Sequence, residues 1–141
     1  MVIRISILID SSVIIAFHNL DDENHNRARV LMEEIVSDKF GRAYISDYIF
    51  DECVTVALIK LKSVEEAVNL GNYLIESEIS MIKATENVLL QSWEIFRKRN
   101  TGRLSFTDCV NIAFLEMLEI DYLATFDIEF KKVPSIKIIG L

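Results

Sequence analysis

The sequence predicts an α/β protein in which a mostly parallel central sheet is covered by helices on both faces. Short apolar segments rich in β-branched residues alternate with longer segments whose apolar residues have helical spacing, which is the pattern of strand–helix repeats. Residues 2–9 are apolar almost throughout, as is typical of a strand buried on both faces. With 141 residues and no linker-like stretch, we expect one domain over residues 1–141.

Capping and turn residues indicate where the first helices begin and end. Residues 11–12, both Ser, can cap a helix that runs to about residue 19. The acidic residues 21–23 can open a second helix, which should end at residues 40–41. The apolar stripe of this second helix is expected to contain Val30, Leu31, Ile35 and Val36.

The rest of the chain is expected to continue the same alternation. Ser63 and Glu66 fit a capping box for a helix that turns Val64, Ala67, Val68 and residues 70–71 toward the core. The helical stretch between residues 46 and 77 could project as an arm that pairs two subunits. Strands are expected at 43–45, 79–82, 122–124 and 136–139, and the other helices at about 46–61, 85–99 and 105–118.

The composition favours a cytoplasmic protein. The apolar residues 1–17 are interrupted by Arg4, Asp10 and the two serines, and no signal-peptidase site follows them. No uninterrupted apolar run reaches the roughly 18 to 20 residues of a membrane helix. Cys53 and Cys109 are too few for a disulfide framework and form no C-x-x-C motif, so we expect both to be small buried residues.

Charge is distributed unevenly along the chain. A formal net charge of −7 and an isoelectric point of about 4.8 argue against broad attraction to nucleic acid. One basic segment nevertheless precedes Asp108, and it could bind phosphates beside an acidic crevice or simply complement the dipole at a helix C-terminus. This basic segment consists of Arg97, Lys98, Arg99 and Arg103.

Four carboxylates occupy positions where strands are expected to end and helices to begin: Asp10, Glu52, Asp108 and Asp127. In a parallel sheet the carboxyl ends of the strands meet at one edge, where open α/β sheets bind ligands. Four converging negative charges repel each other unless a cation neutralises them, and carboxylate oxygens suit a hard cation such as Mg²⁺ or Mn²⁺. The four acids therefore predict metal-dependent chemistry on phosphate.

Each acid also has a purely structural interpretation. Asp10 could be a helix N-cap, Asp108 an ordinary acid in a first helical turn, and Asp127 part of a strand-to-helix turn. Glu52 competes with its neighbour Asp51 for the second position, and we favour Glu52. The occurrence of all four in this chain order favours a functional site over four separate structural roles.

Four motifs carry these acids: residues 8–13 (LIDSSV), 46–52 (SDYIFDE), 105–108 (SFTD) and 124–130 (ATFDIEF). In them the sequence resembles the PIN domain family, and within it the VapC-type toxin ribonucleases. The resemblance covers essentially the whole chain. It implies a three-layer α/β/α fold, a Mg²⁺ or Mn²⁺ site, endoribonuclease activity on RNA, homodimers and, in the toxin branch, an antitoxin protein that blocks the active site.

The resulting hypothesis is hydrolysis of RNA by a water molecule that a metal ion activates. We expect Asp10 and Asp108 to bind the metal directly, and Glu52 and Asp127 to bind it directly or through water. The basic segment would hold flanking phosphates.

Two hydroxyl residues, Ser12 and Thr125, could orient a carboxylate or a phosphate by hydrogen bonding. Because metal activation needs no histidine base, His18 and His25 are expected to take no part. A phosphatase with an aspartyl nucleophile is disfavoured, since it normally has a second Asp where Ser12 stands. The remaining alternative is a non-catalytic PIN-like scaffold that binds RNA or a protein.

Overall fold

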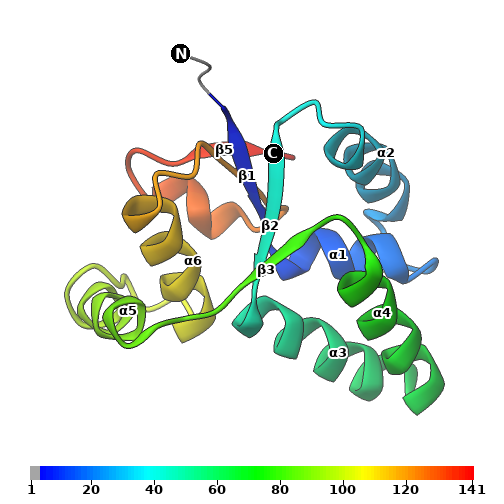
Figure 1. Cartoon of the computed structure of the whole chain (residues 1–141). Helices are drawn as coiled ribbons and strands as arrows, with labels where there is room; N and C mark the ends of the chain where they lie inside the picture. The colour runs from blue at the N-terminus through cyan, green and yellow to red at the C-terminus, as the bar shows by residue number, and fades with distance from the viewer. Residues whose placement is uncertain (1–3) are drawn as a thin grey trace.

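The computed structural model describes residues 4–141, and its sheet has five strands that all pair in parallel, as predicted. The strand order is β3-β2-β1-β4-β5 (Figure 1). The prediction of a strand over residues 2–9 holds from Ser6 onward, and residues 2–3 of it lie outside the described part of the chain. The strands are β1 (Ser6–Ile9), β2 (Arg42–Ser46), β3 (Ser80–Ile82), β4 (Tyr122–Ala124) and β5 (Lys137–Ile139).

Helices cover both faces of the sheet and complete three layers, as Figure 1 shows. One face carries α1 (Ser11–His18), α2 (His25–Val36), α3 (Asp47–Leu61) and α4 (Val64–Glu76). The other face carries α5 (Glu86–Lys98) and α6 (Phe106–Met117), which pack against each other. A 3₁₀ helix, η1 (Ile128–Lys132), connects β4 to β5. In residues 4–141 no helix is both long and apolar enough to cross a membrane.

Four helices begin at a Ser or Thr hydroxyl that caps them. The Oγ atom of Ser46 accepts a hydrogen bond from the N–H of Ile49 at 3.1 Å, which satisfies a donor that the first turn of α3 leaves unpaired. The same kind of bond begins the other three helices, α4, α5 and α6, at Ser63, Thr85 and Ser105.

The first two helices begin differently from the predictions. Ser11 and Ser12 lie inside α1, and neither caps it, because both hydroxyl groups donate to carboxylates of the candidate site. The second helix begins at His25 instead of at residues 21–23. There Asp22 accepts a hydrogen bond from the N–H of Asn24 at 2.8 Å, which holds this segment in a turn.

The buried stripes of α2 and α4 are also rotated relative to the predictions. Val30 and Val36 of α2, and Val64 and Val68 of α4, are exposed although we expected them in the core. The strict three- and four-residue spacing of the truly buried side chains excludes these valines from the stripe. The buried residues are Ala28, Leu31, Met32 and Ile35 in α2, and Leu70, Gly71 and Leu74 in α4.

The helical stretch expected to form an arm is a packed pair of helices. α3 lies against α4 and also contacts α1, so it belongs to the layer that covers the sheet. Its part in pairing subunits stays a prediction.

The centre of the sheet is the point at which the winding of the chain reverses. From β1 the chain proceeds through β2 to β3 on one side, and it later adds β4 and β5 on the other side. The carboxyl ends of β1 and β4 therefore lie at the switch point, which is the position where open α/β sheets bind ligands. Because Ile9 pairs with Ala124, the register places Asp10 next to Thr125.

Phe130 anchors η1 to the core. Its side chain is completely buried, whereas Ile128 of the same short helix is 63% exposed. We expect Phe130→Ala to lower the free energy of unfolding by about 3–5 kcal/mol because it leaves a cavity. The control Ile128→Ala should change it by less than about 0.5 kcal/mol. Urea denaturation followed by circular dichroism measures both, and equal losses would contradict this description of the core.

Candidate active site

Asp10 lies at the end of β1 and is the most deeply buried of the four predicted acids, with 4% of its surface exposed. Its backbone N–H donates to the carbonyl oxygen of Ala124 at 2.9 Å, which continues the hydrogen bonding between β1 and β4. A buried carboxylate needs hydrogen-bond donors around it. Three side chains supply them.

Two hydroxyl groups donate to Oδ2 of Asp10: Oγ1 of Thr125 at 2.7 Å and Oγ of Ser12 at 2.9 Å. Each hydroxyl also accepts a backbone N–H from the segment that follows β4. Thr125 accepts from Asp127 and Ser12 from Phe126, both at 3.0 Å. A hydroxyl has a single proton, and these accepted bonds leave it free to point toward Asp10. The structure thus places Ser12 and Thr125 where they orient the Asp10 carboxylate.

The other oxygen of Asp10 contacts Asn111, which the sequence analysis missed. Nδ2 of Asn111 donates to Oδ1 of Asp10 at 3.2 Å. Asn111 is fully buried in α6, and its own Oδ1 has no hydrogen-bond partner in the structure. Its position was a usable signal, since it is a polar amide one helical turn after Asp108 within the apolar run 109–115.

The surroundings of Asp10 disfavour its ionised form. Burial is the main cause that raises the pKa of Asp10 above its ordinary value. The hydrogen bonds from Thr125 and Ser12 lower this pKa, and the negative charge of Glu52 raises it again. The balance is upward, so a cation near Asp10 would relieve an electrostatic penalty.

Glu52 projects from the second turn of α3 toward the start of α1. Oγ of Ser11 donates a hydrogen bond to Oε1 of Glu52, and Glu52 is close enough to raise the pKa of Asp10. Its neighbour Asp51 is exposed and accepts a hydrogen bond from the exposed Thr55 at 3.4 Å. The structure therefore brings Glu52, and not Asp51, to the other acids.

Asp108 is held in the first turn of α6 by a two-way capping box. Its Oδ2 accepts the N–H of Ser105 at 2.9 Å, and its own N–H donates to Oγ of Ser105 at 3.1 Å. Burial, with smaller contributions from the charges of Asp10 and Asp127, raises the pKa of Asp108 to about 6. Asp108 therefore shares one electrostatic environment with the acids at the ends of β1 and β4.

Asp127 also has the local role that its sequence context suggested. Its Oδ1 accepts the N–H of Glu129 at 2.9 Å and thereby caps η1. Its charge nevertheless contributes to the raised pKa of Asp108. Asp127 thus caps η1 and also lies close enough to Asp108 to act on its charge.

The four acids fit a hard divalent cation by their chemistry. They offer carboxylate oxygens as ligands, which Mg²⁺ and Mn²⁺ prefer, and a cation would offset their mutual repulsion. The unpartnered Oδ1 of Asn111 adds a buried acceptor that no group of the described chain satisfies. Within residues 4–141 no three His, Cys, Asp or Glu side chains form a ready-made metal cage. Oxygens from these acids would therefore have to close around an ion.

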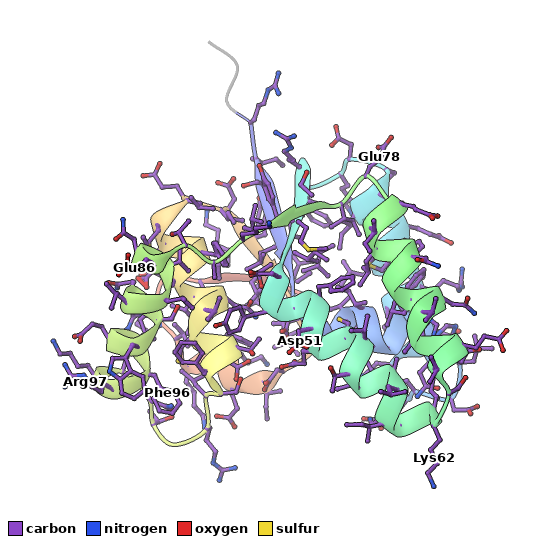
Figure 2. The ribbon with its side chains drawn as sticks, turned by 60° about the horizontal axis from the view of Figure 1, so that its bottom comes forward. Asp51, Lys62, Glu78, Glu86, Phe96 and Arg97 are labelled. Atoms are coloured by element: carbon purple, nitrogen blue, oxygen red, sulfur yellow. The ribbon has the colours of Figure 1, made fainter. Side chains whose placement is uncertain are left out.

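The basic segment lies at the end of α5 and in the loop that leads to α6. Figure 2 shows Arg97 pointing outward from α5. Arg103 is exposed in the loop, five residues before Asp108. The other three members form ion pairs, Arg97 and Lys98 with Glu94, and Arg99 with Glu116.

A series of aromatic rings connects this region with the acids. Trp93, which is 50% exposed, stacks on Phe96 with the ring centroids 5.6 Å apart. The ring centroids of Phe96 and Phe106 are 6.3 Å apart, and those of Phe106 and Tyr48 are 6.0 Å apart. Phe106 and Tyr48 lie in the first turns of α6 and α3, the helices that carry Asp108 and Glu52.

Within residues 4–141 neither the cysteines nor the histidines form a hydrogen bond with the four acids. Both thiols are free and buried, as predicted. Burial, together with the charges of nearby acids, raises the pKa of Cys53 well above its usual value and that of Cys109 to about 11, so both thiols stay protonated in the metal-free protein. His18 lies 3.0 Å from Glu66, and Nδ1 of His25 lies 2.9 Å from the carbonyl oxygen of Ala16.

A model of the PIN domain matches residues 7–136. The chain belongs to the PIN domain family. This confirms the resemblance found in the motifs around the four acids. A curated relative, the VapC ribonuclease of Archaeoglobus fulgidus, is 26% identical over 130 residues, which are 92% of this chain and 81% of the relative.

Solved structures of VapC proteins have the same PIN fold. VapC20 of Mycobacterium tuberculosis, described as a toxin that cleaves the sarcin–ricin loop, superposes with a TM-score of 0.81 at 21% identity, covering 91% of this chain and 95% of that one. VapBC-1 of nontypeable Haemophilus influenzae gives a TM-score of 0.70 at 16% identity, covering 96% and 98%. At these identities the similarity establishes the three-layer fold.

Proposed function

We propose that the protein is a Mg²⁺- or Mn²⁺-dependent endoribonuclease that cleaves phosphodiester bonds of RNA, and that it is the toxin of a toxin–antitoxin pair. The observation that carries this proposal is the position of Asp10, which is buried at the switch point of the sheet beside acids from other elements. Acidic side chains that repel each other destabilise a fold, whereas metal-assisted phosphodiester hydrolysis uses such side chains to bind the metal ion.

The names of the relatives support the same activity. The Archaeoglobus relative is named a ribonuclease, and the Mycobacterium structure is described as that of a toxin that cleaves the sarcin–ricin loop. A structure from Klebsiella pneumoniae with a TM-score of 0.63 is described as a toxin–antitoxin complex. We therefore infer that this chain also acts on RNA and binds an antitoxin protein. We also propose that two copies of the chain form a homodimer.

Each acid would contribute to holding the cation in a distinct way. Asp10, fixed by Thr125 and Ser12, would offer its remaining lone pairs as a direct ligand, and Asp108, fixed by its helix cap, would do the same. Glu52 and Asp127 would bind directly or through water. When bound, the cation would activate a water and offset the charge that develops at the phosphate.

Cleavage of purified total RNA tests the proposal. We expect internal cuts with Mg²⁺ or Mn²⁺ and none with EDTA. RNA binding without cleavage in the presence of either metal would instead identify a PIN-like scaffold. Expression of the protein in bacterial cells should inhibit growth, and the Asp10→Asn variant should not. Toxicity that persists in this variant would argue against RNA cleavage as its cause.

Arg103 is the member of the basic segment that we expect to contribute most to RNA affinity. The other three form ion pairs with acids of the chain, whereas no ion pair of Arg103 is present in the described residues. We expect Arg103→Ala to weaken RNA binding about 3- to 10-fold and to reduce the slope of log K against log salt by about 1. The control is Lys60→Ala, an exposed position near the far end of α3. Equal losses in both variants, measured by filter binding, would contradict a specific role of the basic segment.

A further inference from the structure

Asn111 is a buried amide that uses only half of its hydrogen-bonding capacity. Its side chain is fully buried among apolar neighbours of α6. Its Nδ2 donates to Oδ1 of Asp10, whereas its Oδ1 accepts no hydrogen bond from the described chain. Nearly all buried polar atoms in proteins have a hydrogen-bond partner, so this orphaned acceptor indicates a donor that is not part of the described chain.

The orientation of the amide follows from the carboxylate beside it. If the amide were flipped, its oxygen would face the Asp10 oxygen at 3.2 Å, and the two acceptors would repel each other. Nδ2 therefore faces Asp10, and Oδ1 is the free atom. Because the two amide atoms are bonded to one carbon, Oδ1 lies no more than about 5.5 Å from Oδ1 of Asp10.

The missing partner is a hydrogen-bond donor that can reach this atom beside Asp10. The acids of this site offer acceptor oxygens when ionised, so they cannot serve. The hydroxyl protons of Ser12 and Thr125 already point to Asp10. A water of hydration on a divalent cation is a strong donor, and Mg²⁺ keeps several such waters when carboxylates bind it. A water on an ion at Asp10 falls within the distance that the amide geometry allows.

We propose that Asn111 is a positioning residue of the metal centre. Its Nδ2 holds one edge of Asp10 in place, and its Oδ1 accepts a hydrogen bond from a water in the hydration shell of the cation. This inference rests on the proposed metal-dependent function. Since Asn111 and Asp108 lie one turn apart on α6, a single helix would then hold the ion both directly and through its hydration shell.

Titration calorimetry with Mn²⁺ at pH 7.5 on the intact protein tests this proposal. Asn111→Leu removes both amide functions and keeps the number and branching of the side-chain heavy atoms, and we expect it to weaken Mn²⁺ affinity about 10- to 100-fold. Asn111→Asp removes the donor but keeps an acceptor and adds a charge. We expect it to bind Mn²⁺ at least as tightly as the wild type, and to unfold at a lower temperature without metal.

The matched control is Ser92→Ala. Ser92 is another fully buried polar residue, and its hydroxyl donates to the carbonyl oxygen of Val88 at 2.6 Å within α5. Its replacement should lower the thermal midpoint and leave Mn²⁺ affinity unchanged. If Asn111→Leu does not fold, the comparison of Asn111→Asp with the wild type still decides the question.

Three outcomes would overturn the inference. Wild-type affinity in a folded Asn111→Leu protein would show that the amide has no part in metal binding. A loss of affinity in Asn111→Asp would show that only the Nδ2 bond to Asp10 matters. A wild-type protein that binds no Mn²⁺ would remove the proposed function together with this inference, so the two failures are distinguishable.

Discussion

Asn in place of Asp10 or Asp108 is expected to abolish metal-dependent RNA cleavage, with kcat/KM at least about a hundredfold lower, because each change removes a charged ligand while keeping its shape. The protein should remain folded. Burial already disfavours the ionised form of Asp10, so the neutral Asn should leave the metal-free protein no less stable than the wild type. RNA cleavage assays and thermal denaturation measure the two effects separately.

Asp51→Asn provides the matched control for this prediction. It removes the same charge from an exposed position next to Glu52 in sequence, and it should leave cleavage unchanged. Glu52→Gln, by contrast, should lower cleavage strongly. Full activity in Asp10→Asn or Asp108→Asn would refute the assignment of the site. Activity lost in Asp51→Asn and kept in Glu52→Gln would reverse the choice of the second acid.

Mn²⁺ is expected to stabilise the protein much more at pH 7.5 than at pH 5. The pKa of Asp108 in the folded protein, about 6, lies above its ordinary value of 3.8, and that of Asp10 is raised too. Between these values the folded protein binds more protons than the unfolded chain, so the stability of the metal-free protein falls as the pH rises from about 4 to 6. Above this range the ionised acids repel each other most, and a cation relieves the repulsion.

The size of this effect follows from mass action. At a Mn²⁺ concentration of 100 times Kd, binding adds about 2.7 kcal/mol of stability. For a domain of this size that raises Tm by roughly 8 °C. Thermal scans at pH 5, 6 and 7.5, with and without Mn²⁺, measure it. In the Asp108→Asn variant, the stability of the metal-free protein should fall less as the pH rises from about 4 to 6. A Mn²⁺ effect that is independent of pH would contradict the role of these carboxylates.

The alternation of strands and helices could be predicted because it depends on local patterns. Short apolar segments predicted β1 and β4, and hydroxyl residues at helix starts predicted the beginnings of α3, α4 and α6. The start of α1 could not be predicted in this way. Ser11 and Ser12 have the propensity to cap a helix, but carboxylates compete for their protons: Ser11 donates to Glu52 of α3, 41 residues away, and Ser12 donates to Asp10, two residues before it.

The proximity of the acids was predictable only in outline. Parallel strands bring their carboxyl ends to one edge, so Asp10 and Asp127 could be expected to be close before any coordinates were known. The choice between Asp51 and Glu52 needed the rotation of α3 about its axis, which depends on which face packs against α1 and α4. A sequence window of the helix contains no information on that packing.

Local chemistry in the chain was sufficient to predict the parallel α/β architecture, since strand propensity and capping are properties of neighbouring residues, and the metal ion at the four acids stays a prediction. Tertiary packing alone decided that Asn111 contacts Asp10, that Ser11 holds Glu52, and that burial raises the pKa of Asp108. Burial, hydrogen-bond partners and electrostatic coupling arise between residues far apart in the chain, and they exist only once the sheet and its two helical layers have assembled.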